Sequence, residues 1–245
     1  MTSPILRILV FRILPYLLLA LLIIGIERNM NRLYTPVIAP PGNLPVRLFI
    51  PTGASLEQVV DSLSATPGIR EMNVILNVMK LKHYDRHIKP GSYLLQPGMN
   101  AFQLTDKLIR GLQNPVRVRF HGVRKPEELA GQVSHQIEAD SLSLIRMMQD
   151  QRFLDSLGLT PSSLFTITLP NTYEMWWNTS ARGFLVRMAT EAAAFWNKTR
   201  LEQAREARLT RQEVVILASI IEKETAKNDE KATIAGVYIN RLRKG

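Results

Sequence analysis

The first hydrophobic segment runs from Ile5 to Ile26 (ILRILVFRILPYLLLALLIIGI), and only Arg7 and Arg12 interrupt it. A membrane-spanning helix needs about 20 predominantly apolar residues, and this segment reaches that length if both arginines extend toward the membrane surface. The following sequence, GIERNMNRLY, contains no small-x-small cleavage site, which favours a retained anchor over a cleaved signal peptide. We therefore predict a cytoplasmic stub and a transmembrane helix in residues 1–28, with the remainder exported.

A short polar and proline-containing stretch separates this segment from the first periodic pattern. Residues 29–44 (NMNRLYTPVIAPPGNL) contain prolines and a glycine and show no helical period. Such composition is typical of a linker.

A strand, a turn with glycine and an amphipathic helix then occur in sequence more than once. Val46–Leu63 and Gly91–Leu108 both follow this scheme, with predicted helix caps at Ser55 and Asn100. A weaker third copy begins with the strand VRVRF at Val116. Units of this kind build small α+β modules such as the glycan-binding LysM fold, although common local signals explain the pattern equally well. We predict one or two LysM-like α+β modules in residues 45–140.

Helical periodicity dominates after Ser141. Apolar residues recur at helical spacing in Ser141–Leu157, Ala181–Ala207 and Gln212–Leu242. We predict a mostly α domain in residues 141–245. The fold class is then α+β: a transmembrane helix, LysM-like modules and a helical domain.

The charge and the cysteine count exclude some classes of function. The formal net charge is +10, but Lys and Arg are scattered rather than clustered, so we predict no nucleic-acid partner. An anionic membrane or cell-wall polymer fits this charge, and so does a basic surface without a partner. Without cysteine there is no disulfide or thiolate site. His83 and His87 are spaced i, i+4 but lack the carboxylate of an HExxH motif, so we interpret them as surface residues.

The segment from Glu213 to Lys227 (EVVILASIIEKETAK) is the clearest candidate for catalysis. In a helix, Glu222 and Glu224 point to nearly opposite faces, and Glu224 continues the apolar stripe that contains Ile220. A carboxyl group beside apolar side chains is suited to act as a general acid. Spacing alone also allows a simpler interpretation, an exposed Glu224–Lys227 ion pair at i, i+3.

Two other segments carry side chains suited to binding sugars. Leu169–Trp177 (LPNTYEMWW) combines aromatic rings with carboxylate and amide groups, which can stack on sugar rings and bind hydroxyls. A buried aromatic cluster between helices is an equally good interpretation. In Gly236–Gly245 (GVYINRLRKG), Tyr238 and Arg241 share one helical face.

The chain resembles the endolytic murein transglycosylases, also called the MltG or YceG-like family. The features that carry the resemblance are the predicted anchor and the segments TYEMWWNTSA and IIEKETAKNDEKATIAGVYINRLRKG. The resemblance covers most of the chain and is most specific in IIEKET and VYINRLRKG. It implies a single-pass protein of the bacterial inner membrane whose catalytic domain faces the periplasm. Nascent peptidoglycan glycan strands are the implied substrate, cleaved between MurNAc and GlcNAc to leave 1,6-anhydro-MurNAc ends. Peptidoglycan synthases of the elongation or division machinery are candidate partners.

The resemblance also implies roles for individual residues. The second glutamate of the EKET motif is catalytic in the family, which corresponds to Glu224. One general acid and base is enough because the muramic O6 of the substrate is the nucleophile, so no metal or cofactor is expected. The residues expected to bind substrate are Tyr173, Glu174, Glu222, Tyr238, Asn240 and Arg241.

The sequence departs from the family pattern in two places. Asn171 stands where many relatives have Asp, and the segment that follows VYINRLRKG in the family, with an LQ-DPT motif, is not present in this sequence. We therefore expect the catalytic domain to be incomplete at its C-terminal end. The rival interpretation is a non-catalytic peptidoglycan-binding or cell-division scaffold protein, which would tolerate loss of Glu224.

Overall fold

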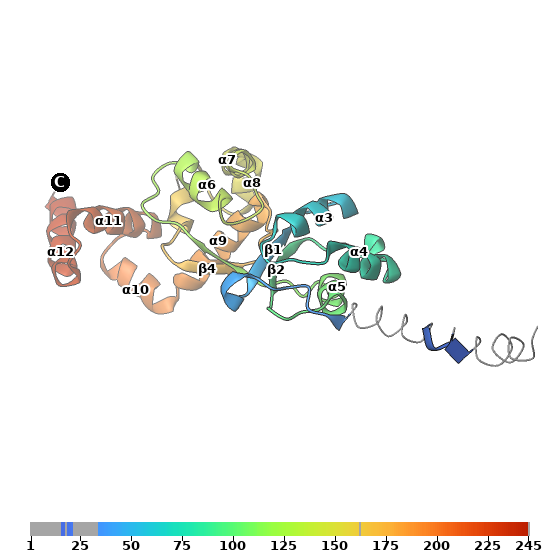
Figure 1. Ribbon diagram of the computed structural model, residues 1–245. Coiled ribbons are helices and arrows are strands. Elements are labelled where there is room, and N and C mark those ends of the chain that lie inside the picture. Colours follow the sequence, from blue (N-terminus) through green and yellow to red (C-terminus); the bar gives the residue numbers. More distant parts are fainter. Residues whose placement is uncertain (1–15, 18, 22–33, 162, 245) are drawn as a thin grey trace, which may run out of the picture. The chain divides into compact units, whose positions relative to one another are not determined.

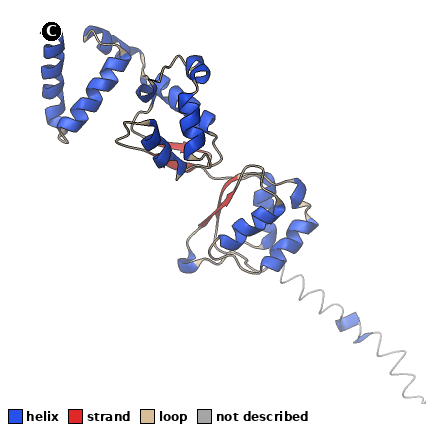
Figure 2. Cartoon of the chain, turned by 90° about the horizontal axis from the view of Figure 1, so that it is seen from above, coloured by secondary structure: helices blue, strands red, loops and turns tan. Residues whose placement is uncertain are grey.

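The computed structural model describes residues 16, 17, 19–21, 34–161 and 163–244. It divides into two compact units, Met1–Pro115 and Val116–Gly245. Both units combine helices with a small antiparallel sheet, so the predicted α+β class is confirmed (Figure 2). Most of the predicted transmembrane helix lies outside the described residues, and the residues that are described contain no helix long and apolar enough to cross a membrane.

The first unit is built around two antiparallel strands, with Leu48 opposite Tyr93 at the centre of the pair. Between the strands the chain forms two helices and a 3-10 turn, and a third helix follows the second strand (Figure 1). In chain order the elements are η2 (Pro41–Asn43), β1 (Val46–Ile50), α3 (Leu56–Ala65), α4 (Met72–Leu81), η3 (Tyr84–Arg86), β2 (Gly91–Leu95) and α5 (Ala101–Arg110).

Two of the predicted strand-turn-helix units are present with the predicted caps. Ser55 caps α3 and Asn100 caps α5, and each forms a reciprocal capping box with the residue three positions later. Gly53 and Gly98 lie in the preceding turns with φ of 75° and 84°, a conformation that glycine adopts without a steric penalty. The turn chemistry visible in the sequence therefore determines where both helices begin.

The segment before β1 differs from the predicted linker of residues 29–44. Val37 and Ile38 are buried in the core of the first unit. Their backbone amides both donate to the Met99 carbonyl, and the Arg70 amide donates to the Val37 carbonyl. Two apolar residues between prolines give no recognisable period, so only the backbone pairing shows that this segment is part of the fold.

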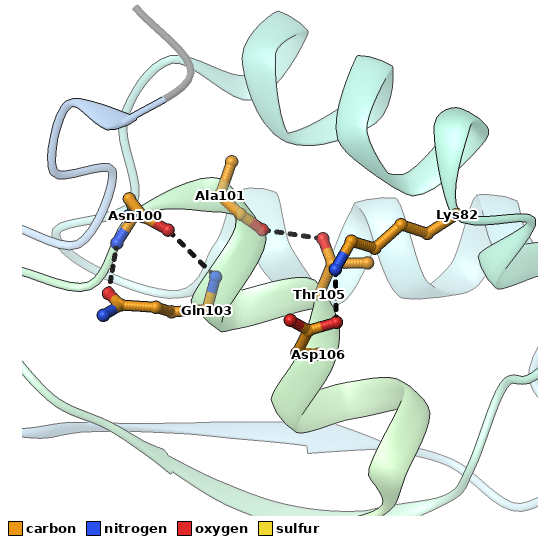
Figure 3. A network of polar contacts seen from close by, with 6 residues as sticks. All are labelled: Lys82, Asn100, Ala101, Gln103, Thr105 and Asp106. Carbon is orange, nitrogen blue, oxygen red and sulfur yellow. Dashed lines mark hydrogen bonds and ion pairs between the residues drawn. The ribbon is translucent and has the colours of Figure 1, made fainter. Parts of the chain in front are cut away.

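The cap of α5 supports a test of the first unit. The Asn100 side chain accepts from the Gln103 amide at 2.9 Å, and the Gln103 side chain accepts from the Asn100 amide at 3.0 Å (Figure 3). Figure 3 also shows Lys82, from the end of α4, paired with Asp106 of α5. Asn100→Ala should lower the free energy of unfolding by about 1 kcal/mol, because a backbone donor loses its partner.

The matched control is Asn77→Ala. Asn77 is an exposed residue inside α4 whose side chain has no hydrogen bond within the described chain. Its replacement should change stability by less than about 0.5 kcal/mol. Denaturant unfolding of the whole protein measures both variants, and equal effects would show that the cap contributes nothing specific.

The second unit contains two antiparallel strands and most of the helices. Val118 pairs with Tyr173 at the centre of the sheet. The core includes side chains from both strands and from helices over much of the unit, among them Leu129, Leu144 and Phe184. The elements are β3 (Val116–Arg119), α6 (Pro126–Ser134), α7 (Ser141–Gln149), α8 (Gln151–Ser156), η4 (Leu164–Ile167), β4 (Thr172–Met175), α9 (Ala181–Phe195), α10 (Lys198–Glu206), α11 (Arg211–Glu224) and α12 (Asn228–Lys244).

The division between the units falls earlier than the predicted boundary at residues 140 and 141. The third strand-turn-helix copy, β3 and α6, belongs to the second unit. Its strand pairs with β4, and Val118 and Leu129 are buried in the same core as Phe184. The strand β4 lies more than fifty residues further along the chain, and local periodicity does not predict pairing over that separation.

Each of the three long helical segments predicted after Ser141 is divided into two helices. Asp150 and Asn197, at the first two of these breaks, are N-caps whose side chains accept from backbone amides of the helices they begin. Asp and Asn favour caps over helix interiors, because their side chains compete for backbone hydrogen bonds. The helical character of this part is as predicted, and capping side chains explain the first two of the three breaks.

Candidate functional site

The connection between α11 and α12 carries the residue predicted to be catalytic. Glu224 is the last residue of α11, and the backbone leaves the helix at Thr225. The Thr225 hydroxyl donates to Glu230 Oε2 at 2.7 Å and accepts from the Lys227 amide at 3.0 Å. Lys227 Nζ lies 3.1 Å from Glu230 Oε1, which closes the network. These contacts fix the backbone directly after Glu224.

Glu224 is hydrogen-bonded to a residue of the next helix. The Tyr238 hydroxyl donates to Glu224 Oε1 at 3.1 Å. The guanidinium carbon of Arg241 lies 6.0 Å from the centroid of the Tyr238 ring, at the outer limit of a cation–π contact. The structure thus brings together Glu224, Tyr238 and Arg241, which the sequence placed on two separate segments.

The hydrogen bond also affects the titration of the phenol. Donation to Glu224 raises the pKa of Tyr238, and desolvation and the charge of Glu224 act in the same direction. Arg241 opposes the shift. The phenol therefore stays protonated at neutral pH and remains available as a donor to the carboxylate.

The surroundings of Glu224 are less apolar than predicted. Leu217 and Ile221 are buried, but Ile220 is 38% exposed and Glu224 is exposed. Glu224 lies at the very end of the helix, where the chain turns away, so the apolar stripe does not enclose it. The alternative interpretation, an ion pair between Glu224 and Lys227, is not found either, because Lys227 pairs with Glu230.

Glu222 and Asn240 make no contacts that would place them in the site. Both are exposed, and neither has a hydrogen bond or ion pair with any described residue. The side chains of Glu222 and Glu224 are two positions apart on one helix and so project in nearly opposite directions.

Tyr173 and Glu174 lie elsewhere in the second unit. Tyr173 is buried, its ring stacks on Phe120 at 5.6 Å, and its hydroxyl donates to the Leu169 carbonyl. Burial raises the pKa of this phenol. Tyr173 is therefore a core residue here, as the aromatic-cluster interpretation expected. Glu174 is exposed and forms an ion pair with Arg117.

Apart from Glu222 and Asn240, the predicted residues therefore form two groups. No hydrogen bond, ion pair or ring contact among the described residues connects Tyr173 or Glu174 with Glu224 or Tyr238. His83 and His87 are exposed, as predicted. The described ranges contain no group of three or more His, Cys, Asp or Glu residues arranged to hold a metal ion.

Comparison with known proteins identifies the family. The sequence model of the YceG-like family matches residues 48–245, which include part of the first unit, all of the second unit and the EKET segment. The chain belongs to the YceG-like family. The match confirms the resemblance inferred from the motifs.

Two curated relatives of this YceG-like chain are named endolytic murein transglycosylase, from Streptococcus pneumoniae strains D39 and R6. They are 25% and 24% identical to it over an alignment of 229 positions, and the alignments cover 80% of this chain and 40% of each relative. The chain therefore spans 40% of the length of these relatives. A crystal structure of a yceG-like protein from Listeria monocytogenes is also similar, with 22% identity and a TM-score of 0.49 over 82% of this chain and 71% of that one.

Two arginines of the YceG-like chain were not among the predicted site residues. Arg117 and Arg119 alternate with Val116, Val118 and Phe120 along β3 and its end, so their side chains are exposed while Val118 and Phe120 are buried. The alternation in VRVRF carries this signal. It shows which residues face outward but not which residues lie opposite them.

Proposed function

We propose that this YceG-like protein is a membrane-bound lytic transglycosylase that cleaves peptidoglycan glycan strands, with Glu224 as the general acid and base. The observation that carries the proposal is the hydrogen bond from Tyr238 to Glu224, which joins the two most specific motifs of the family resemblance. The names of the curated relatives support the same reaction. The predicted metal- and cofactor-free chemistry needs only this carboxyl group.

The proposed reaction has two proton transfers and no added reactant. Protonated Glu224 donates its proton to the glycosidic oxygen between MurNAc and GlcNAc, and the bond from the anomeric carbon to that oxygen breaks. The muramic O6 attacks the anomeric carbon and loses its proton to the Glu224 carboxylate. The products are a 1,6-anhydro-MurNAc end and a GlcNAc end with a free hydroxyl, and the carboxyl group is restored.

An internal nucleophile explains why one carboxyl group suffices. Most glycosidases need two, because a second group must activate water or attack the sugar. Attack within one molecule can reach an effective molarity of about 10⁵ M or more. The exposure of Glu224 is compatible with this reaction, since a bound glycan would itself cover the carboxyl group.

Product analysis tests the proposed reaction. Glycan strands digested with the whole protein should yield 1,6-anhydro-MurNAc ends, identified by mass spectrometry as one water lighter than reducing ends. A complete absence of new chain ends would support the scaffold interpretation.

Tyr238 is expected to position Glu224 for this reaction. Tyr238→Phe removes the hydroxyl that donates to Glu224 Oε1 and keeps the ring near Arg241. We expect the rate of anhydro-end formation to fall about tenfold, since the carboxyl group loses one fixed contact. The matched control is Tyr34→Phe: Tyr34 is 59% exposed and stacks on Phe102. An equal loss of rate in both variants would contradict a specific role for Tyr238.

The proposed location is the bacterial inner membrane, with the folded units in the periplasm and the first unit serving as a LysM-like glycan-binding module. The membrane location is proposed because of the uncharged run from Ile13 to Ile26 in the sequence. Protease added to spheroplasts should degrade the chain beyond Leu44. Protection of that region would place the units in the cytoplasm and remove access to the proposed substrate.

A further inference from the structure

The two-stranded sheet of the second unit has one buried and one exposed face. Tyr173 and Met175 of β4 and Val118 of β3 point into the core. The opposite face carries two cross-strand pairs, Arg117 with Glu174 and Arg119 with Thr172. We call these four residues and the adjacent Trp176 the outer ribbon face.

Both arginines are held by one nitrogen and leave the rest of the guanidinium available. Arg117 Nε lies 3.4 Å from Glu174 Oε1, and Arg119 Nε lies 2.9 Å from Thr172 Oγ1. In both residues the terminal amino groups have no hydrogen-bond partner within the described ranges. Because a guanidinium has five donors in a fixed plane, the terminal amino groups can bind a further carboxylate while Nε keeps its contact.

The pair of Arg117 and Glu174 does not neutralise this face. Their side chains are 70% and 60% exposed, and an ion pair that exposed to solvent is weak. Arg119 is paired with a neutral hydroxyl, so the face keeps one unmatched positive charge.

An exposed aromatic residue lies next to the two pairs. Trp176 directly follows β4, its side chain is 50% exposed, and its ring makes no aromatic or cation–π contact with other described residues. Strand alternation places position 176 on the side of Glu174. An open indole face suits the CH face of a sugar ring.

We propose that the outer ribbon face binds a glycan that bears carboxylates, with Arg117 and Arg119 on the carboxylates and Trp176 against a sugar ring. The proposal rests on the proposed function and deepens it by naming residues, other than those around Glu224, that would bind the same substrate. Muramic acid and the peptides attached to it carry carboxylates, whereas a chain of N-acetylglucosamine alone is neutral. The arginines then distinguish the anionic glycan from the neutral one, and Trp176 contributes to binding of both.

Calorimetric titration of the whole protein tests this assignment. The two ligands are a peptidoglycan oligomer with its peptides and an N-acetylglucosamine oligomer of equal length. All titrations use the Glu224→Gln background, so that the glycan is not consumed. The parent background should bind the anionic oligomer about tenfold more tightly than the neutral one, because the neutral oligomer has no carboxylate to form a charge-assisted contact with an arginine.

The variants separate charge, geometry and stacking. Arg117→Gln with Arg119→Gln should lower affinity for the anionic oligomer about tenfold or more and leave the neutral one unchanged. Arg117→Lys with Arg119→Lys keeps the charge but not the planar guanidinium. Its affinity for the anionic oligomer should lie between that of the parent background and that of the glutamine variant. Trp176→Ala should weaken both ligands, and Trp176→Phe should restore most of that binding.

The control removes equal charge elsewhere. Lys198 and Arg205 are both exposed on α10, and Lys198 forms only a weak pair with Glu202 at 3.9 Å. Lys198→Gln with Arg205→Gln should leave both affinities unchanged. Circular dichroism confirms that each variant is folded, and the lysine pair replaces the glutamine pair if the latter does not fold.

Several outcomes would overturn the assignment. Equal binding of both oligomers by the parent background, or an equal loss in the α10 control, would show that the arginines do not recognise carboxylates. Binding to vesicles of anionic phospholipid through these arginines, without binding to the glycan, would assign the face to a membrane. In each case, formation of 1,6-anhydro ends by the protein with Glu224 intact would show that the proposed function still holds.

Discussion

Glu224→Gln is expected to abolish the formation of 1,6-anhydro ends. Glutamine keeps the shape of the side chain and can still accept the hydrogen bond from Tyr238, but it has no proton to give to the glycosidic oxygen. General acid–base catalysis contributes about 10²–10⁴-fold to rate, and here one group performs both transfers. We expect at least that loss in the rate of end formation, measured by mass spectrometry of glycan digests, with folding and glycan binding close to normal.

Glu222→Gln is the matched control. It makes the same chemical change two positions away, on an exposed side chain that has no hydrogen bond or ion pair in the described structure. It should retain measurable turnover. If both variants are inactive, the two glutamates share the substrate and their assignment to opposite faces is wrong. If Glu224→Gln cleaves glycan at the parent rate, Glu224 is not the general acid, and the scaffold interpretation of this segment is favoured.

Phe184→Ala is expected to have the largest effect on stability. Phe184 is fully buried in the core of the second unit, and its ring meets Phe120 edge to face at 6.1 Å. Removing a buried phenylalanine side chain costs about 3–5 kcal/mol, because apolar contacts are lost and a cavity remains. Denaturant unfolding should show this decrease in the free energy of unfolding.

Phe195→Ala provides the comparison for Phe184. Phe195 lies at the end of the same helix, and it is 39% exposed. Its ring contacts Trp196 and lies under the Arg200 guanidinium. Phe195→Ala should therefore lower the free energy of unfolding, but by less than half as much as Phe184→Ala. Equal destabilisation by both variants would show that the Phe120–Phe184 contact is not central to this core.

Local signals in the sequence predicted much of the first unit. Ser55 and Asn100 each precede an amphipathic run, with Gln three positions later, and both form capping boxes. The same chemistry failed to show where the later helices break, since Asp150 and Asn197 interrupt runs whose apolar period continues. A period reports which face is buried, whereas a capping side chain decides where the helix starts again.

Contacts between distant segments could not be predicted. Val37 and Ile38 occupy the core because their backbone pairs with Met99, more than sixty residues further along. β3 joins the second unit because it pairs with β4. Both depend on partners that no local pattern specifies, and so does the position of the boundary between the units.

The sequence predicted the residues of the candidate site better than it predicted their geometry. Glu224 and Tyr238 were both named from their motifs, but their hydrogen bond depends on how α12 packs on α11. The predicted apolar surroundings of Glu224 assumed that the helix continues past it, and the helix ends there. Tyr173 was named for its chemistry, although alternation along β4 directs it into the core.

Digestion in ¹⁸O-labelled water tests the central claim most directly, because the transglycosylase reaction uses no water as nucleophile. Peptidoglycan glycan strands are incubated with the whole protein or with its Glu224→Gln variant, and the new ends are identified by mass spectrometry. We predict that the parent protein forms 1,6-anhydro-MurNAc ends without the label and that the variant forms none. Labelled reducing ends from the parent protein, or unlabelled anhydro ends at the parent rate from Glu224→Gln, would contradict the proposed reaction or its assigned residue.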